Sequence, residues 1–286
     1  MSTVYIPCDS AALAAGADEV ADALHQAAAA RGIAIDIQRN SSRGMFWLEP
    51  LVEVVTPKGR MAYGPVTQED VAGLLDAGFL HGGSHALSLG LTEDIAYLAK
   101  QQRLTFARMG ITRPLSLDDY AAHGGWAGLK NAIAMDGAEV VQTVLDSGLR
   151  GRGGAAFPAG IKWRTVRSTP AAQKYVVCNA DEGDSGTFSD RMTLEGDPYM
   201  LIEGMAIAGL AVGASQGYIY IRSEYPHAIA TMNTAISLAQ AAGYLGDNVM
   251  GSGKAFHLHV RKAAGAYVCG EETAMLESIE GKRGIV

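Results

Sequence analysis

One glycine-rich basic loop stands out among the residues that could do chemistry. The stretch SGLRGRGGAAFPAGIKW, residues 147–163, holds five glycines, three basic side chains and no acidic one. Its glycines would let backbone N–H groups approach an anion closely. Arg150, Arg152 and Lys162 add positive charge, and Phe157 offers a flat face for stacking. The stretch predicts an anion-binding loop; the alternative is a glycine-rich turn with solvated basic side chains.

The same loop contains a pattern typical of dinucleotide-binding proteins. Residues 151–156, GRGGAA, match G-x-G-x-x-A. That pattern needs a preceding strand, whereas residues 138–150 have a helical pattern. It also needs an acidic residue about twenty positions later to bind a ribose, and residues 151–180 contain none. We therefore expect anion binding by glycine backbone and not a standard Rossmann turn.

An acidic loop, residues 178–191 (CNADEGDSGTFSDR), directly follows an apolar strand pattern. It carries Asp181, Glu182, Asp184 and Asp190. The oxygen ligands of a hard cation would recur at alternating positions, and this spacing does not provide them. We expect the carboxylates to accept hydrogen bonds from sugar-type hydroxyl groups. A solvated acidic loop is the alternative.

A third loop, residues 265–272 (GAYVCGEE), also follows a strand pattern. Gly265 and Gly270 allow a tight backbone. Glu271 and Glu272 open a helical pattern, where negative charge suits the helix dipole. This electrostatic role would explain the two acids without any ligand.

The three loops belong to a pattern of alternating strands and helices. Strands are expected at residues 174–180, 217–222 and 256–263, and helices at 197–214, 226–243 and 271–281. This alternation predicts an α/β layered sheet with parallel strands. Ligands of such sheets lie outside the carboxyl ends of the strands. One basic loop for phosphates and two acidic loops for hydroxyls therefore predict a nucleotide site.

The first part of the chain has a different order of elements. Strands are expected at residues 3–8, 33–38, 50–57 and 60–66, with one helix at 11–32 and another beginning at the Thr67 cap. This is the thioredoxin-like order. Cys8 ends the first strand and has no cysteine partner at short range, so we expect a packed cysteine and not a redox site.

These patterns predict three parts. Residues 1–80 form a thioredoxin-like domain without cluster cysteines, 81–125 a connector with a loop at 81–90 and a helix at 92–109, and 126–286 a Rossmann-like layered α/β nucleotide-binding domain. The sequence stops at Val286 without a cap or tail, which leads us to expect the front part of a longer protein.

Composition excludes several functions. The net charge of −7 argues against nucleic-acid binding. The apolar run at residues 205–214 is too short to span a bilayer, and the N-terminus lacks the pattern of a signal peptide. Three cysteines lie far apart, so no local metal site is visible, and a reducing cytoplasm is expected.

Three motifs in order, GLRGRGGAAFPAGIKW, CNADEGDSGTFSDR and GAYVCGEETAMLESIEGKRG, resemble one protein family. It comprises the NADH-oxidising flavoprotein subunit of respiratory complex I, the diaphorase subunits of NAD-reducing hydrogenases and the beta subunits of NAD-dependent molybdenum formate dehydrogenases. The resemblance covers about residues 100–286. Residues 105–129, behind a thioredoxin-like domain without cluster cysteines, most resemble the formate dehydrogenase beta subunit.

The resemblance implies a diaphorase that binds FMN non-covalently and NAD(H) against it. A hydride would pass between nicotinamide and flavin, and single electrons between flavin and iron–sulfur clusters, so no side chain need be catalytic. It also implies a 4Fe-4S cluster in a C-terminal domain beyond Val286. The implied partners are a molybdenum-containing formate dehydrogenase catalytic subunit and a small 2Fe-2S thioredoxin-like subunit.

Site residues carry over by motif. FMN would contact Gly151, Arg152, Gly153, Lys162, Asn179, Asp181, Tyr267, Gly270, Glu271 and Glu272, and NAD would contact Gly154, Phe157, Asp184 and Glu272. Three positions depart from the family: Asp184 where Glu is frequent, Ala156 where Gly is common, and Thr165 where an aromatic residue is common. These departures concern NAD affinity and not the flavin site.

Three hypotheses remain open. The first is an electron-transfer flavoprotein subunit, whose complex could be a formate dehydrogenase, complex I or a hydrogenase. The second is a module that binds a nucleotide without turnover. The third is a structural adaptor whose N-terminal domain docks a partner subunit, and it is compatible with the first.

Overall fold

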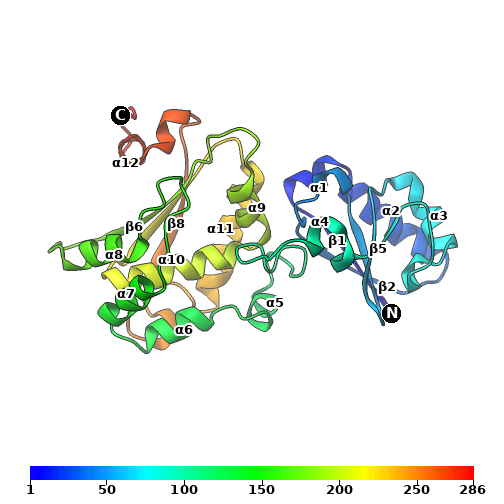
Figure 1. Ribbon diagram of the computed structural model, residues 1–286, viewed down its shortest axis with the longest axis horizontal. Helices are drawn as coiled ribbons and strands as arrows, with labels where there is room; N and C mark the ends of the chain where they lie inside the picture. The colour runs from blue at the N-terminus through cyan, green and yellow to red at the C-terminus, as the bar shows by residue number, and fades with distance from the viewer. The chain divides into compact units, whose positions relative to one another are not determined.

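The computed structural model describes residues 1–286, which divide into two compact units (Figure 1). The first unit is Met1–Pro114 with Glu195–Asp197, and the second is Leu115–Leu194 with Pro198–Val286. The expected connector, residues 81–125, is thus divided between the units. Its first part joins the N-terminal sheet because residues 88–91 form an additional strand paired with the fourth.

The first unit is built on a five-stranded mixed sheet in the order β2-β1-β3-β4-β5. The strands are β1 Ser2–Pro7, β2 Ile35–Asn40, β3 Val52–Thr56, β4 Gly59–Tyr63 and β5 Ser88–Leu91. Strands β1 and β2 are parallel, and the other pairs are antiparallel. This βαβ unit followed by a hairpin and a helix is the expected thioredoxin-like arrangement. Strand β5 lies in a stretch expected to be a loop.

The helices of the first unit are shorter than expected. They are α1 Ser10–Ala14, α2 Ala17–Ala30, α3 Val71–Asp76 and α4 Ala96–Ala99. The single helix expected at residues 11–32 is broken at Gly16, whose φ of +97° no helix accommodates. The helix expected at 92–109 is wrong beyond α4. There, tertiary contacts override helical propensity: Arg103 donates to the carbonyl of Arg43, and Met109 is buried.

Apolar side chains of the first unit form two clusters. The larger cluster joins the sheet to α2 and α3 and includes Val4, Ile6, Leu24, Leu74 and Phe79. The smaller one joins β4 to α4 and includes Met45, Leu51, Ala62 and Leu98. The short helix α4 is therefore held by Leu98, which leaves the rest of its surface for other contacts.

The second unit contains a three-stranded parallel sheet in the order β6-β7-β8. Its strands are β6 Tyr175–Ala180, β7 Gln216–Ile221 and β8 His257–Lys262, and all three were expected from the sequence. The further helices are α5 Leu117–Ala122, α6 Ala127–Ile133, α7 Gly137–Asp146, α8 Ala159–Ser168, α9 Ser189–Gly196, α10 Pro198–Val212, α11 Pro226–Ala241 and α12 Glu272–Ile279. Helix α10 packs on β6 and β7, and α11 packs on β8 (Figure 1). Because the strands are parallel, their carboxyl ends lie at one edge.

A buried carboxylate organises the core beside this sheet. Glu203 of α10 accepts hydrogen bonds from the Tyr120 hydroxyl at 2.5 Å and from the backbone N–H groups of Trp126 and Leu129 at 2.8 and 2.9 Å. It thereby satisfies donors at the start of α6, where Trp126 has a left-handed φ of +64°. The Trp126 ring stacks on Tyr244 with 3.9 Å between centroids. None of the helices combines the length and apolar composition that crossing a bilayer requires.

Candidate functional site

The three loops singled out in the sequence meet at one cleft of about 790 Å³ beyond the ends of β6 and β8. This volume lies within the range of small-molecule and cofactor sites. Nine of the expected site residues line it: Arg152, Gly153, Gly154, Asn179, Asp181, Asp184, Tyr267, Gly270 and Glu271. Glu182, Gly183, Thr187, Ser189, Asp190, Val268 and Val286 complete the lining.

Four of the expected residues do not line the cleft. Gly151 donates its N–H to the carbonyl of Phe157 at 2.9 Å, so both close the base of the basic loop. Lys162 Nζ lies 3.8 Å from Glu272 Oε2 and 5.9 Å from the centroid of the Phe157 ring. Lys162, Phe157 and Glu272 therefore form a group of their own.

The basic loop joins α7 to α8 and is shaped like a narrow hairpin. Arg150 pairs with Pro158 as an isolated bridge, and the Arg150 guanidinium donates to the carbonyl of Ala156 at 3.0 Å. Arg150 is thus used within the loop, while Arg152 faces the cleft. At Gly153 and Gly154 an added Cβ would meet no atom within 4 Å. The backbone there is open to a ligand, which is the requirement for anion binding by N–H groups.

The Asn179 side chain ties the end of β6 to the loop that follows β8. Its Nδ2 donates to the carbonyl of Gly270 at 2.7 Å, and its Oδ1 accepts from the N–H of Asp181 at 3.2 Å. A Cβ on Gly270 would lie 3.1 Å from Asp181 Oδ2, so glycine permits this close approach. Burial raises the pKa of Asp181, and the positive charge of Arg222 partly offsets the effect.

Glu182 has a structural role that its place among the acids did not reveal. Its carboxylate accepts hydrogen bonds from the N–H groups of Asp190 and Arg191 at 2.7 and 3.1 Å and from the Ser189 hydroxyl at 3.2 Å. It therefore caps the start of α9 from outside the helix. Its own φ is +41°, a left-handed value that is rare for this residue type.

Two further residues near the cleft were not among the expected site residues. Burial, followed by the charge of Glu182, raises the pKa of Asp190 to about 6. Arg222, at the end of β7, donates from Nη1 to the carbonyl of Glu182 at 2.7 Å. Its Nε is buried without a hydrogen-bond partner. The strand pattern GYIYIR placed Arg222 at a carboxyl end, which was the only sequence signal for it.

Tyr267 and Asp184 meet across the mouth of the cleft. The Tyr267 hydroxyl donates to Asp184 Oδ1 at 3.0 Å, and this hydrogen bond to a carboxylate raises the pKa of Tyr267. A Cβ on Gly183 would lie 2.7 Å from the Tyr267 ring. The tyrosine ring thus covers the backbone of the acidic loop while remaining largely exposed.

Glu271 has the role at the start of a helix that the sequence offered as an alternative to ligand binding. Its carboxylate accepts from the N–H groups of Thr273 and Ala274 at 2.9 and 3.0 Å, which makes it the N-cap of α12. These hydrogen bonds lower the pKa of Glu271. Because the residue also lines the cleft, its charge remains in reach of a ligand.

The arrangement suits a ligand with an anionic end and a polyhydroxyl part. Open glycine N–H groups and Arg152 can hold an anion, and the buried Asp181 carboxylate can accept hydrogen bonds from hydroxyl groups. No His, Cys, Asp or Glu cluster of three or more is placed to hold a metal ion. An open anion-binding loop beside acceptors for hydroxyl groups fits a phosphorylated cofactor such as FMN.

Comparison of the sequence with characterised proteins gives relatives of one kind. The NADP-reducing hydrogenase subunit HndC of Solidesulfovibrio fructosivorans is 53% identical over 185 residues, which are 65% of this chain and 38% of that protein. An NADH-quinone oxidoreductase subunit of Rhizobium meliloti is 52% identical over 58% of this chain and 40% of that protein. Its counterpart in Escherichia coli is 42% identical over 63% and 41%. The matched part thus spans about 40% of the length of these relatives.

A solved structure shares the fold of the whole chain. The crystal structure of an NAD⁺-reducing [NiFe]-hydrogenase in the air-oxidized state aligns with 99% of this chain and 46% of its own, with a TM-score of 0.51 and 24% identity. Residues 144–286, which contain all three loops of the cleft, match the family model described as the Nuo51 FMN-binding domain. By this match and the relatives above, the chain belongs to the family of the Nuo51 FMN-binding domain.

Proposed function

We propose that this chain is the nucleotide-binding part of a diaphorase subunit that passes electrons between NAD(H) and iron–sulfur clusters. The observation that carries the proposal is the convergence of the three motif loops on one cleft within the FMN-binding family domain. When bound, FMN supplies the hydride and one-electron chemistry of such a site. The chain's own residues then have to bind FMN and NAD(H), orient the two ligands against each other and shield them from water.

We assign the roles from the hydrogen-bonding groups and charges that each residue can offer to a ligand. Arg152 and the N–H groups of Gly153 and Gly154 would hold the phosphate, because this loop carries no acid and an added Cβ at Gly153 or Gly154 meets nothing. The N–H of Gly151 is used within the loop, so Gly151 would shape the loop that holds FMN. Asp181 and Asn179 would hold hydroxyl groups or ring polar atoms of FMN. Tyr267, Gly270 and Glu271 line the same cleft and would close the FMN site.

The group formed by Phe157, Lys162 and Glu272 would serve the nicotinamide nucleotide. An aromatic face beside a cation and a carboxylate can stack a base and bind ribose hydroxyls. Asp184 faces the cleft from the acidic loop and would lie beside this nucleotide. The family motif assigns Lys162 to FMN and Glu272 to both FMN and NAD, so this group would lie where the two ligands meet.

The test is the absorbance spectrum of the purified full-length subunit, followed by anaerobic addition of NADH. Flavin bands that bleach with NADH are expected. Arg152→Gln should weaken FMN binding roughly tenfold or more, because it removes a charge-assisted hydrogen bond. Arg164→Gln, an exposed residue of α8 outside the cleft, is the matched control. A folded, colourless protein that neither binds added FMN nor responds to NADH would leave a nucleotide-binding or docking module as the better account.

For the assembly, we propose an NAD-dependent molybdenum formate dehydrogenase with a 4Fe-4S cluster beyond Val286 and a small 2Fe-2S subunit. It is supported by the resemblance of residues 105–129 and by a thioredoxin-like unit in which the sole cysteine is Cys8. The relatives named above favour a hydrogenase or a quinone oxidoreductase as the alternative.

Purification through a tag on the full-length chromosomal protein separates these assemblies. Molybdenum in the complex and formate-dependent NAD⁺ reduction are expected. Nickel with hydrogen-dependent reduction, or quinone-dependent NADH oxidation without molybdenum, would assign the chain to one of the alternatives. Iron analysis of the isolated subunit tests the cluster.

A further inference from the structure

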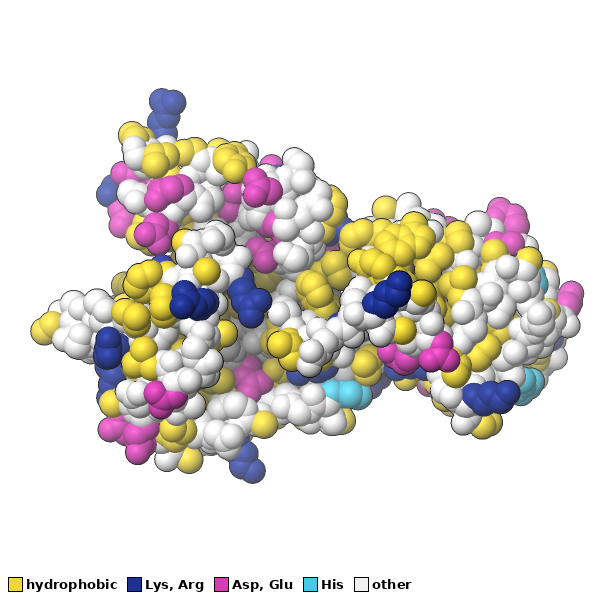
Figure 2. All heavy atoms as spheres, viewed as in Figure 1, with side chains coloured by type: hydrophobic (Ala, Val, Ile, Leu, Met, Phe, Trp, Pro, Cys, Tyr) yellow, Lys and Arg dark blue, Asp and Glu magenta, His cyan; other side chains and the backbone are white.

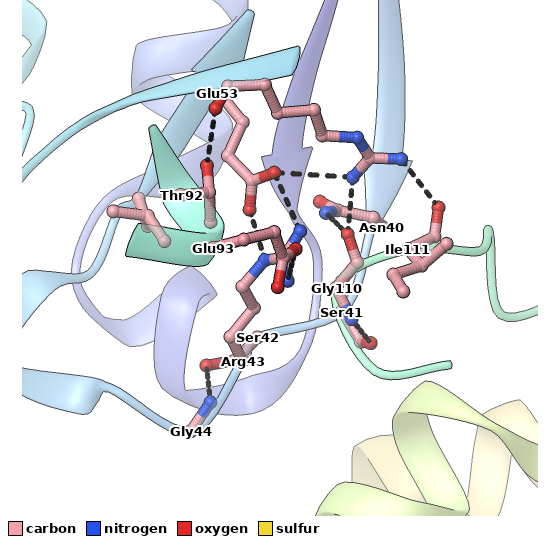
Figure 3. Close-up of polar contacts among 12 residues, drawn as sticks. Asn40, Ser41, Ser42, Arg43, Gly44, Glu53, Thr92, Glu93, Gly110 and Ile111 are labelled. Carbon is pink, nitrogen blue, oxygen red and sulfur yellow. Dashed lines mark hydrogen bonds and ion pairs between the residues drawn. The ribbon is translucent and has the colours of Figure 1, made fainter. Parts of the chain in front are cut away.

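Three arginines and two glutamates of the first unit form a polar network that is buried at Arg43 and Glu53. Arg43, 4% exposed, donates from Nε and Nη2 to Glu53 at 2.6 and 3.0 Å and from Nη1 to Glu93 at 2.9 Å (Figure 3). Arg60 lies 3.3 Å from the same Glu53 carboxylate and donates to the carbonyl of Gly110 at 2.6 Å. Arg43 and Arg60 are therefore neutralised by carboxylates within the unit.

Arg103 joins this network without a carboxylate of its own. It donates from Nη2 to the carbonyl of Arg43 at 2.5 Å and from Nε to Gln101 Oε1 at 3.0 Å, both uncharged acceptors. Its Nη1 is buried and has no hydrogen-bond partner. Burial and then the neighbouring charge of Arg43 lower the pKa of Arg103. The three arginines exceed the two glutamates by one positive charge, and the exposed Glu93 offsets the charge of Arg103 only in part. An excess charge is costly at a partly buried site.

A pocket of about 210 Å³ opens beside this charge. Its lining combines Arg43, Arg103, Gln101 and Glu93 with Leu98 and other apolar residues. Buried donors in native proteins are nearly always paired, so an orphaned one calls for a partner from outside the chain. Since the missing charge is a single negative one, a carboxylate is the ligand that fits the pocket's composition.

Large exposed apolar side chains adjoin residues that line the pocket: Tyr97 precedes Leu98, and Leu104 follows Arg103. Trp47 and Tyr97 contact each other edge to face with 5.0 Å between centroids, although 59% and 48% of their surfaces are exposed. Leu104, the neighbour of Arg103, is 78% exposed. In the view of Figure 2, hydrophobic side chains gather on the part of this unit where α4 lies. Trp, Tyr and Arg are the residue types enriched where binding energy concentrates in protein interfaces.

We propose that this aromatic–arginine surface (Trp47, Tyr97, Arg103 and Leu104) docks a partner protein that inserts an Asp, Glu or C-terminal carboxylate beside Arg103. Apolar side chains flanking the carboxylate cover Trp47, Tyr97 and Leu104. A free small carboxylate would satisfy Arg103 but would leave these three side chains exposed, so a protein is the better fit. This surface shares no residue with the lining of the nucleotide cleft. Only the identity of the partner subunit rests on the assembly proposed above.

Lys100 offers a direct probe of the partner carboxylate. It is exposed and precedes Gln101, which lines the pocket. Carbodiimide treatment of the purified complex of full-length subunits should join Lys100 to an Asp, a Glu or the C-terminus of another subunit, as read by peptide mass spectrometry. The link should disappear in Lys100→Arg, which keeps the charge but cannot form the amide under these conditions.

The affinity test uses four variants of the full-length subunit. Arg103→Gln and Trp47→Ala should each weaken association with the partner roughly tenfold or more, since each removes a contact at the interface centre. Arg31→Gln, which breaks an exposed ion pair with Asp76 elsewhere on this unit, should leave affinity unchanged. As a further check, Arg103→Lys keeps the charge and should retain part of the affinity, which separates docking from folding.

The outcomes distinguish other occupants. Unchanged affinity in Arg103→Gln and Trp47→Ala, with no cross-link from Lys100, overturns the proposal. So does a cross-link to a second copy of this chain, or stabilisation by millimolar acetate that Arg103→Gln abolishes while assembly persists. Failure of the flavin test alone leaves this surface untouched, because neither the cross-link nor the affinity depends on NADH.

Discussion

Arg222 Nη1 donates to the carbonyl oxygen of Glu182 at 2.7 Å, which fixes the loop after β6 to the end of the neighbouring strand β7. The Glu182 carboxylate in turn caps α9. One arginine thus holds the backbone of the acidic loop, while Asp181, Asp184 and Asp190 of that loop line the cleft. Its charge also acts on Asp181, whose pKa it lowers against the effect of burial.

Replacing Arg222 should therefore weaken FMN binding and change its pH dependence. Arg222→Gln removes a charge-assisted hydrogen bond worth about 1.5–3 kcal/mol, so we expect roughly tenfold or greater loss of FMN affinity. Without the arginine the pKa of Asp181 rises, and the loss of affinity on acidification should begin at a higher pH. Fluorescence titration of FMN between pH 5 and pH 8 measures both effects. Arg222→Lys should recover part of each, and an unshifted pH profile in Arg222→Gln would contradict the electrostatic role.

The buried carboxyl group of Glu49 should make the stability of the first unit depend on pH. Burial raises the pKa of Glu49 to about 7 from 4.5, although Ser42 and the N–H of Leu51 donate to it. The folded state therefore holds this proton more tightly than the unfolded chain does. Its stabilising contribution is present below pH 4.5 and is lost as the pH rises to about 7, by up to about 3 kcal/mol.

Hydrogen exchange of the β1 and β3 peptides at several pH values measures this slope. Glu49→Gln should flatten it, because the amide does not titrate. A variant with the same decline between pH 5 and pH 8 as the natural protein would assign the effect to another group.

Glu203 should be a major determinant of the stability of the second unit. Glu203→Gln keeps the shape but cannot accept from the Tyr120 hydroxyl and two N–H groups as a carboxylate does. We expect a loss of about 2 kcal/mol in the free energy of unfolding. Tyr120→Phe should cost about 1 kcal/mol, and the double variant less than the sum, since the residues interact directly. Urea denaturation of the four proteins forms the cycle, and strict additivity would argue against the network.

Gly270 in the cleft and Gly204 in α10 provide a test variant and its control. A Cβ at Gly270 would lie 3.1 Å from Asp181 Oδ2, whereas a Cβ at Gly204, exposed in α10, meets nothing within 4 Å. Gly270→Ala should displace Asp181 and weaken FMN binding. Gly204→Ala should leave binding intact and raise stability by about 0.5–1 kcal/mol, because alanine favours the helix. Equal FMN dissociation constants for both variants would show that the contact at Gly270 is adaptable.

The secondary structure of the second unit could be predicted from the sequence more fully than that of the first unit. Its apolar strands 174–180, 217–222 and 256–263 alternate with long helical patterns, and a parallel sheet brings their following loops together. The first unit differs from its predicted secondary structure where short elements are stabilised by contacts with residues far away in the sequence. Strand β5 is only four residues long and contains Gly90 at φ +82°. Residues 100–109 lose their helix to contacts of Arg103 and Met109.

Within the site, residue type predicted which loops meet but not the role of each acid. Glu182 was expected to accept hydrogen bonds from a ligand, and it acts as a helix cap in the fold. Glu271 caps α12, which is the helix-start role that the sequence also offered. Whether a carboxylate turns to a helix end or to a cleft depends on backbone angles such as φ +41° at Glu182, which no local pattern encodes. Arg222 was missed because its role is to hold a neighbouring loop.

The two caps have a consequence for where the anionic end of a ligand can be held. Glu182 and Glu271 occupy the positive ends of α9 and α12 beside the cleft. At both helix ends the partial positive charge therefore already faces a carboxylate of the chain itself. An anionic group in this cleft would instead find positive charge and open backbone at Arg152, Gly153 and Gly154.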